Sequence, residues 1–215
     1  MGTWKAKLLL FDFDGTLIDS KFDIATSVNL TLRDLELPVR PVEEIYSFVG
    51  DGVKRLLRLS VGEGHHDRYE AALGIFRNHY LQHCVKTTRF YAGIGEVLNF
   101  YQDRKKAIVT NKSPEYTLCI MEGLRARNLF HAIEGAREAA DLKPEPAMLH
   151  RVLELLGVDP TETVMIGDST NDVRAAQAAG VKACAVGYGY GNREKVLELK
   201  PDFYCERPED LLRLF

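Results

Sequence analysis

Short apolar segments alternate with helical patterns along this chain, and this alternation limits the possible folds more than any other feature of the sequence. The first segment, 7–13, is an apolar run that stops in a turn at 14–16, as expected for a strand buried on both faces. Four later segments are similarly short and able to form strands: 107–110, 163–166, 183–186 and 202–204. Strands separated by helices predict a doubly wound, Rossmann-like α/β fold, in which helices cover both faces of a parallel sheet.

The helices between the later strands are marked by residues that commonly begin and end helices. Ser113 and Pro114 are expected to cap and open a helix that runs toward Gly123. Two further helices are expected to end at Gly157 and Gly180. Each of these segments is the single helix that a parallel crossover needs.

The stretch between the first and second strands breaks this pattern, because roughly 90 residues separate them where one helix would suffice. Ser20 and Asp23 resemble a capping box at the start of a helix there. We therefore predict an all-α domain at residues 17–87, inserted into an α/β core formed by residues 1–16 and 88–215. Apolar residues recur at helical spacing in this insertion, at Ala25, Val28, Leu32 and Leu35 and again at Tyr69, Leu73, Phe76 and Tyr80.

The charge balance limits the partners that the protein can bind. The chain has 28 basic and 31 acidic side chains, a formal charge of -3, and no block of Lys or Arg. Binding to nucleic acid or to an anionic membrane surface requires clustered positive charge, so neither partner is expected. A small anionic substrate remains compatible with this composition.

Two further features predict a cytoplasmic protein with reduced thiols. No apolar run approaches the roughly 20 residues that span a bilayer, and residues 1–6 contain neither the apolar region of a signal peptide nor a myristoylation site. The four cysteines lie far apart and form no Cys-x-x-Cys motif, so neither a zinc site nor a disulfide framework is expected: Cys84, Cys119, Cys184 and Cys205.

Aspartates follow two of the predicted strands. Asp12 and Asp14 stand two positions apart at the end of the first strand, so both side chains can lie on one face of the extended chain. Asp168 and Asp172 follow the strand at 163–166. Ligands of a doubly wound sheet bind beyond the carboxyl ends of its strands, and we expect both pairs of aspartates to meet there.

Such a cluster of carboxylates needs a counter-charge. Two carboxylates about 4 Å apart repel by about 4 kcal/mol at an effective dielectric constant near 20, so several together require protons, a cation or both. Mg²⁺ is the expected ion, because it prefers oxygen ligands and retains water for a substrate phosphate.

Three more polar residues are expected in the same layer. Thr110 and Asn111 end the second strand, and Lys143 precedes a predicted helix. A hydroxyl and an ammonium group bind phosphate oxygens, and the lysine also offsets the charge of the carboxylates. Together with Mg²⁺ this set predicts phosphoryl transfer, in which charge stabilisation and alignment provide most of the catalysis.

These segments, taken in order, resemble the four motifs of the haloacid dehalogenase superfamily. The motifs correspond to Asp12-Phe13-Asp14-Gly15-Thr16, Thr110-Asn111, Lys143-Pro144, and Gly167-Asp168-Ser169 through Asp172. The resemblance covers almost the whole chain, and it implies that the helical insertion is the small cap domain of this family. Four further stretches are similar to the phosphoglycolate phosphatase-like subgroup: 17–20, 48–57, 109–112 and 187–189.

The resemblance implies a role for each core residue. Asp12 would attack phosphorus and form an aspartyl phosphate. Asp14 would protonate the leaving oxygen and then activate water. Thr110 and Lys143 would hold the transferring phosphoryl group, and Asn111 would assist near the substrate. Mg²⁺ would be held by Asp12, the backbone carbonyl of Asp14 and Asp168, with Asp172 in support.

In similar capped phosphatases a glycine-containing turn of the cap selects the leaving group. Gly50, Asp51 and Gly52 fit that turn, and Lys54 or Arg55 would then approach a substrate carboxylate. The alternative is that the charged residues form a solvated face of the helix that follows the turn.

Two other features receive less specific interpretations. Lys112 is expected to be solvated, although it follows the Thr-Asn motif of the second strand. The segment 187–191, Gly-Tyr-Gly-Tyr-Gly, lacks the spacing of a phosphate-binding loop and is interpreted as a flexible loop.

The leading hypothesis is a Mg²⁺-dependent phosphatase, monomeric or homodimeric, that acts on a small phosphorylated metabolite. The expected substrate is 2-phosphoglycolate. A dehalogenase needs no acid for its leaving group, so Asp14 favours a phosphatase or a phosphomutase. A β-phosphoglucomutase or a pyrophosphatase of the same fold is the alternative. A phospho-accepting, receiver-like signalling domain is the alternative from another class, although such a domain needs only about 120 residues and no cap.

Overall fold

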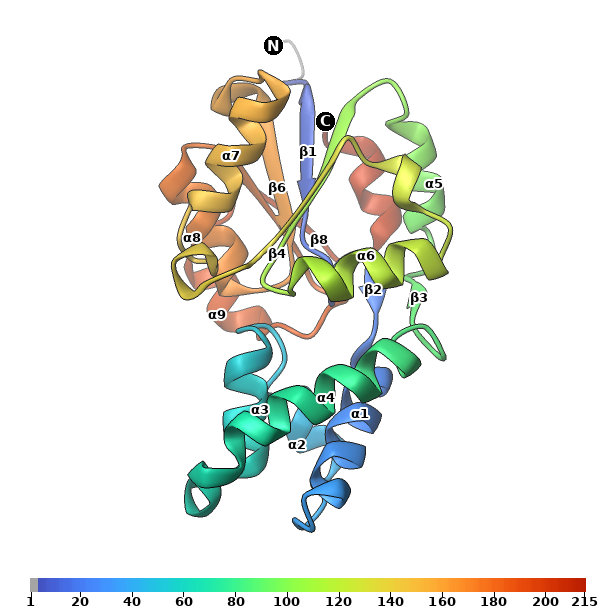
Figure 1. Cartoon of the computed structure of the whole chain (residues 1–215). Helices are drawn as coiled ribbons and strands as arrows, with labels where there is room; N and C mark the ends of the chain where they lie inside the picture. The colour runs from blue at the N-terminus through green and yellow to red at the C-terminus, as the bar shows by residue number, and fades with distance from the viewer. Residues whose placement is uncertain (1–3) are drawn as a thin grey trace.

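The computed structural model describes residues 4–215, so the first three residues of the predicted 1–16 core segment lie outside the described residues. One parallel sheet has the strand order β5-β4-β1-β6-β7-β8 (Figure 1). The sheet and its helices confirm the predicted doubly wound α/β fold. The strands are β1 (Leu8–Phe11), β4 (Lys105–Thr110), β5 (Ala132–Gly135), β6 (Thr163–Gly167), β7 (Lys182–Val186) and β8 (Phe203–Cys205).

Two apolar cores lie on opposite faces of this sheet, because successive side chains of a strand point to opposite sides. Leu9 and Phe11 of β1 belong to the core beneath α5 and α6, whereas Leu8 and Leu10 belong to the core beneath α7, α8 and α9. None of the helices within residues 4–215 is long and apolar enough to cross a membrane. The helices that cover the sheet are α5 (Ile94–Phe100), α6 (Pro114–Gly123), α7 (Ala147–Leu156), α8 (Thr170–Ala179) and α9 (Arg193–Glu198).

Strand β5 was not predicted from the sequence. It pairs with β4 at the edge of the sheet, and its two central residues, Ile133 and Glu134, are only partly buried. Glu134 forms an ion pair with Arg151 of α7, in which Nε and Oε1 are 2.9 Å apart. A four-residue segment with a single β-branched side chain has little strand character of its own, so pairing with β4 is what makes it a strand.

The remaining helices, α1 to α4, form a separate group beyond the carboxyl ends of the strands (Figure 1). Helix α4 packs on both α1 and α3. The chain leaves the sheet through β2 and returns through β3, and these two short strands pair antiparallel. The elements of this region are β2 (Ile18–Asp19), α1 (Lys21–Asp34), α2 (Val42–Tyr46), α3 (Val53–Val61), α4 (Tyr69–His83) and β3 (Arg89–Phe90).

The predicted capping box at Ser20 and Asp23 is wrong. Ser20 occupies the N-cap position of α1, but its side chain forms no capping hydrogen bond and donates to Asp14 instead. The buried Asp23 carboxylate accepts hydrogen bonds from the backbone N–H and the hydroxyl of both Thr87 and Thr88, over distances of 2.7 to 3.1 Å. Asp23 therefore ties the first turn of α1 to the returning chain just before β3.

We expect Asp23→Asn to lower the free energy of unfolding by about 2 to 3 kcal/mol at neutral pH, because an amide replaces a charged acceptor of several hydrogen bonds. Burial opposes ionisation of Asp23, but the hydrogen bonds from Thr87 and Thr88 outweigh it and lower the pKa of this carboxyl. The wild-type advantage is therefore present above the unfolded-state pKa of about 3.9, and it decreases as the pH falls toward the lower folded-state value.

Urea denaturation of both proteins between pH 7 and pH 3 measures this difference. Asp67→Asn is the matched control, because the Asp67 side chain is 75% exposed and its replacement should change stability little. A loss of stability in Asp23→Asn that stayed constant across the whole pH range would contradict the assigned role of the carboxylate.

Candidate active site

Three strand ends converge on one side of the sheet. The chain runs from β1 outward to β4 and β5 and then returns to β6 on the other side of β1, so the strand order reverses at β1, which is where doubly wound folds bind ligands. Asp12 follows β1, Thr110 ends β4, and Asp168 follows β6. All three line one cavity, as the sequence predicted from their positions.

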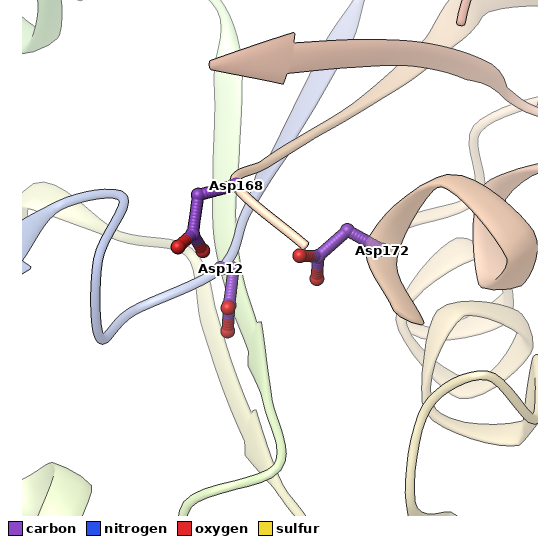
Figure 2. A group of neighbouring side chains, drawn as sticks. All are labelled: Asp12, Asp168 and Asp172. Carbon is purple, nitrogen blue, oxygen red and sulfur yellow. The ribbon is translucent and has the colours of Figure 1, made fainter. Parts of the chain in front are cut away.

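The carboxylates of Asp12, Asp168 and Asp172 form a compact group (Figure 2). One oxygen atom from each residue lies within 4.8 Å of the others. Burial raises the pKa of Asp12 to about 6, with Lys143 opposing and Asp172 adding to the effect. Burial is also the largest cause of the rise in the pKa of Asp168 to about 7, and the negative charges of Asp172 and Asp12 raise it further. These carboxylates are therefore costly to ionise together without a cation.

The donor set fits Mg²⁺, which prefers carboxylate oxygens and several remaining waters. Asp12 Oδ1 is buried without a hydrogen bond, although the Lys143 ammonium lies 2.8 Å away as an ion-pair partner. Asp168 faces the same cavity. A divalent cation would give Asp12 Oδ1 a ligand partner and lower the pKa of both carboxyls.

Lys143 bridges two of the carboxylates. Its Nζ lies 2.8 Å from Asp12 Oδ1 and 2.6 Å from Asp172 Oδ1, and it also donates to the carbonyl of Val109 at 2.8 Å. The other oxygen of Asp172 accepts from the backbone N–H and the hydroxyl of Ser169 at the start of α8. Both oxygens of Asp172 are thus engaged, and this residue chiefly holds Lys143 beside Asp12.

Asp14 does not belong to that group of carboxylates and has partners of its own. Its Oδ1 accepts from the Ser20 hydroxyl, and its Oδ2 lies 2.8 Å from Lys112 Nζ. Lys112 also donates to the hydroxyl of Tyr80 on α4 at 2.9 Å. The prediction that Lys112 is solvated is wrong, because its side chain is only 8% exposed.

Asn111 connects the core to the cap turn. Its Nδ2 donates to the carbonyls of Gly50 and Lys143, and its Oδ1 accepts from the backbone N–H of Lys143. The Thr110 hydroxyl lines the cavity and accepts from the backbone N–H of Lys112. The Asn111 side chain is therefore occupied in positioning the turn and the residue that bridges the carboxylates.

The predicted cap residues fall into two sets. Gly50 and Gly52 line the cavity, but Asp51 and Arg55 are not among the described residues that line it. Arg55 Nε pairs instead with Asp51 Oδ2 at 3.0 Å, and the two side chains are 61% and 49% exposed. Asn171 donates to the other oxygen of Asp51. The turn at residues 50–52 therefore contributes its glycines, rather than this charged pair, to the cavity wall.

Comparison with known proteins agrees with this geometry. Residues 9–186 match the family described as haloacid dehalogenase-like hydrolase. The chain belongs to this family. A phosphoglycolate phosphatase of Aquifex aeolicus is 33% identical over 97% of this chain and 96% of its own. Another from Colwellia psychrerythraea is 36% identical over 96% and 95% of the two chains. The solved structure of a predicted phosphoglycolate phosphatase from Haemophilus somnus has a TM-score of 0.89 and 28% identity, and it covers 99% of each chain.

The loop at 187–191 contacts the candidate active site of this hydrolase. The backbone N–H groups of Tyr190 and Gly191 donate to Asp168 Oδ2 at 2.7 and 3.0 Å. A Cβ atom at Gly189 would lie 2.3 Å from both Asp168 Cβ and the Gly15 carbonyl oxygen, so glycine permits this close approach. The segment is a loop, as the sequence indicated, but that interpretation missed its hydrogen bonds to Asp168. The repeated glycines directly after a strand were the available signal.

The cavity of the hydrolase has two chemically different sides. Its core side carries the carboxylates and Thr110, whereas the side formed by α1, α3 and α4 is apolar or aromatic. The residues on the helical side are Ile24, Val53, Leu56, Phe76 and Tyr80.

Proposed function

We propose that this hydrolase is a phosphatase that releases phosphate from 2-phosphoglycolate in a Mg²⁺-dependent reaction through an aspartyl phosphate on Asp12. The observation that carries the proposal is the grouping of the Asp12 carboxylate with those of Asp168 and Asp172 beside the Lys143 ammonium, with Asp14 in the same cavity. The names of the two relatives above support the choice of substrate.

The residues would act in two steps. A carboxylate oxygen of Asp12 attacks phosphorus, and the bond to the ester oxygen breaks while Asp14 gives that oxygen a proton. Asp14 then takes a proton from water, which attacks the aspartyl phosphate and releases phosphate. The Thr110 hydroxyl holds a phosphoryl oxygen during both steps, and the positive charge of Lys143, which stays beside Asp12, attracts the phosphoryl oxygens. Mg²⁺ bound by Asp12, Asp168 and the backbone carbonyl of Asp14 would neutralise the developing charge.

We further propose that residues 17–87 form a cap domain on a core made of residues 1–16 and 88–215. The antiparallel pair of β2 and β3 and the contact of Asp23 with Thr87 and Thr88 support this division. A cap in this position would exclude bulk water from the cavity and admit only the single water molecule that hydrolyses the aspartyl phosphate.

Phosphate release by the purified protein across a panel of phosphorylated metabolites tests the proposal. We expect 2-phosphoglycolate to be hydrolysed fastest, with Mg²⁺ required and a chelator abolishing the activity. Pyrophosphate as the best substrate, or conversion of a sugar 1-phosphate to a 6-phosphate without phosphate release, would support the alternative enzymes. A stable phosphoprotein without turnover would support a receiver-like signalling domain.

Metal binding has a separate readout. Mg²⁺ is expected to raise the unfolding temperature of the wild-type protein, because a ligand that binds only the folded state stabilises it. The rise should disappear in Asp168→Asn, whose amide is a poorer ligand, and it should persist in Asp103→Asn, whose side chain is 69% exposed in the wild type. An equal rise in all three proteins would contradict a site at Asp168.

A further inference from the structure

One basic side chain lies in the cavity beside Asp14, the proposed acid for the leaving group. Among the described residues that line the cavity, Lys112 is the only one with a positive charge. It comes from the core, directly after Thr110 and Asn111, and it contacts Tyr80 in the wall of apolar and aromatic residues that the helices contribute. A negatively charged group on the leaving alcohol would therefore meet a single cation, which is paired with Asp14 and only 8% exposed, and burial strengthens such an ion pair.

Lys112 has one donor left for such a group. Its ammonium carries three N–H donors. Two acceptors are within reach among residues 4–215, namely Asp14 Oδ2 at 2.8 Å and the Tyr80 hydroxyl at 2.9 Å. The Tyr80 ring also lies against the ammonium, with its centroid 4.8 Å from Nζ. These contacts hold the lysine in place, and the third N–H can serve a ligand in the cavity.

We propose that Lys112 binds the carboxylate of the leaving group and so selects phosphomonoesters whose alcohol carries a carboxylate next to the ester carbon. The inference rests on the proposed function, because it takes Asp14 as the acid that protonates the ester oxygen. That oxygen must lie within hydrogen-bond distance of Asp14, about 2.5 to 3.0 Å. In 2-phosphoglycolate a single methylene group separates the ester oxygen from the carboxylate carbon, so a cation that contacts Asp14 also reaches the carboxylate.

The structure disfavours the two cations that the sequence suggested for this contact. Arg55 is paired with Asp51 and mostly exposed, and Lys54 is also exposed. Neither belongs to the described lining of the cavity. Their place on α3 makes them a solvated face, which was the alternative interpretation of that helix.

The test compares 2-phosphoglycolate with 2-hydroxyethyl phosphate, in which a neutral alcohol replaces the carboxylate. The wild-type enzyme should prefer 2-phosphoglycolate in kcat/KM by about tenfold or more. Lys112→Met should lower kcat/KM for 2-phosphoglycolate by about 10- to 100-fold more than for 2-hydroxyethyl phosphate, the usual range for one charge-assisted hydrogen bond. Lys112→Arg should retain part of the preference.

The ratio of the two substrates separates recognition from general damage. A lysine that only positioned Asp14 would cause equal losses on both substrates, and equal losses in Lys112→Met would overturn the proposal. Loss of the preference in Arg55→Met but not in Lys112→Met would also overturn it.

Inhibition of the wild-type enzyme tests the proposal without depending on whether the variants fold. Glycolate should inhibit the wild-type protein at a concentration about tenfold or more below that needed for ethylene glycol; equal inhibition would overturn the proposal. A wild-type enzyme that hydrolyses both esters equally well would overturn the role of Lys112 but leave the phosphatase mechanism intact. Failure of the mechanism itself would be seen as phosphate release that survives the loss of Asp12.

Discussion

Replacing Asp12 with asparagine is expected to lower kcat for phosphate release by about four orders of magnitude or more, as the loss of a nucleophile does in other enzymes. The amide keeps the size and shape of the side chain, but it cannot displace an alcohol from phosphorus. Asp12 is also the carboxylate that Lys143 contacts at 2.8 Å, so the change removes both the attacking atom and one partner of this ion pair.

Two measurements test the effect of replacing Asp12. Release of inorganic phosphate from 2-phosphoglycolate gives the rate, and mass spectrometry of protein quenched during turnover detects the phosphoryl group on the residue 12 peptide of the wild type. Both signals should vanish in Asp12→Asn and persist in Asp103→Asn. Retention of phosphate release in Asp12→Asn would falsify the aspartyl phosphate mechanism.

Replacing Lys143 with methionine is expected to cause the largest loss of stability, about 3 to 5 kcal/mol, because it leaves buried carboxylates without their cation. The Lys143 side chain is 2% exposed, and its ammonium contacts both Asp12 and Asp172. Burial alone would lower the pKa of Lys143, but the two carboxylates outweigh it and hold this pKa above its ordinary value. The folded protein therefore depends on the charged form of the lysine.

Activity should fall together with stability in Lys143→Met. The charge of Lys143 opposes the rise that burial causes in the pKa of Asp12. Without the lysine this pKa rises further, so a larger fraction of Asp12 carries a proton at neutral pH and cannot act as a nucleophile. Phosphate release from folded protein below its unfolding midpoint measures this effect apart from unfolding.

A second substitution distinguishes an unpaired charge from a simple cavity. Asp172→Asn removes one of the two carboxylates, so the double variant Lys143→Met with Asp172→Asn should be more stable than Lys143→Met alone. Urea denaturation of the four proteins gives the coupling free energy. Additive losses would show that the two side chains act independently and would contradict the bridge.

Several predictions depended on residues that are close together in the chain, and these agree with the structure. The apolar run before Asp12 forms β1, and the Ser113-Pro114 pair begins α6. Gly157 and Gly180 end α7 and α8 in the left-handed conformation. Local patterns are informative here because a strand buried on both faces and a helix end each impose their own residue preferences.

Other predictions failed because the deciding partner is distant in the chain. Asp23 has the residue type of a capping box, but Thr87 and Thr88 capture its carboxylate across 64 and 65 positions. Lysine is a residue type that usually lies at the surface, but Lys112 is buried by its ion pair with Asp14 and its hydrogen bond to Tyr80. Strand β5 forms because it pairs with β4, and the sequence of its four residues does not predict this pairing.

The sequence by itself determined the doubly wound fold, the large helical insertion and the strand ends that carry Asp12, Thr110 and Asp168, because periodicity and turn residues report directly on backbone conformation. Only the tertiary structure decided how each charge is paired. It assigned Lys143 to Asp12 and Asp172, Lys112 to Asp14, and Arg55 to Asp51. The physical reason is that pairing depends on distance and burial in space, and a side chain's type and its neighbours in the sequence specify neither.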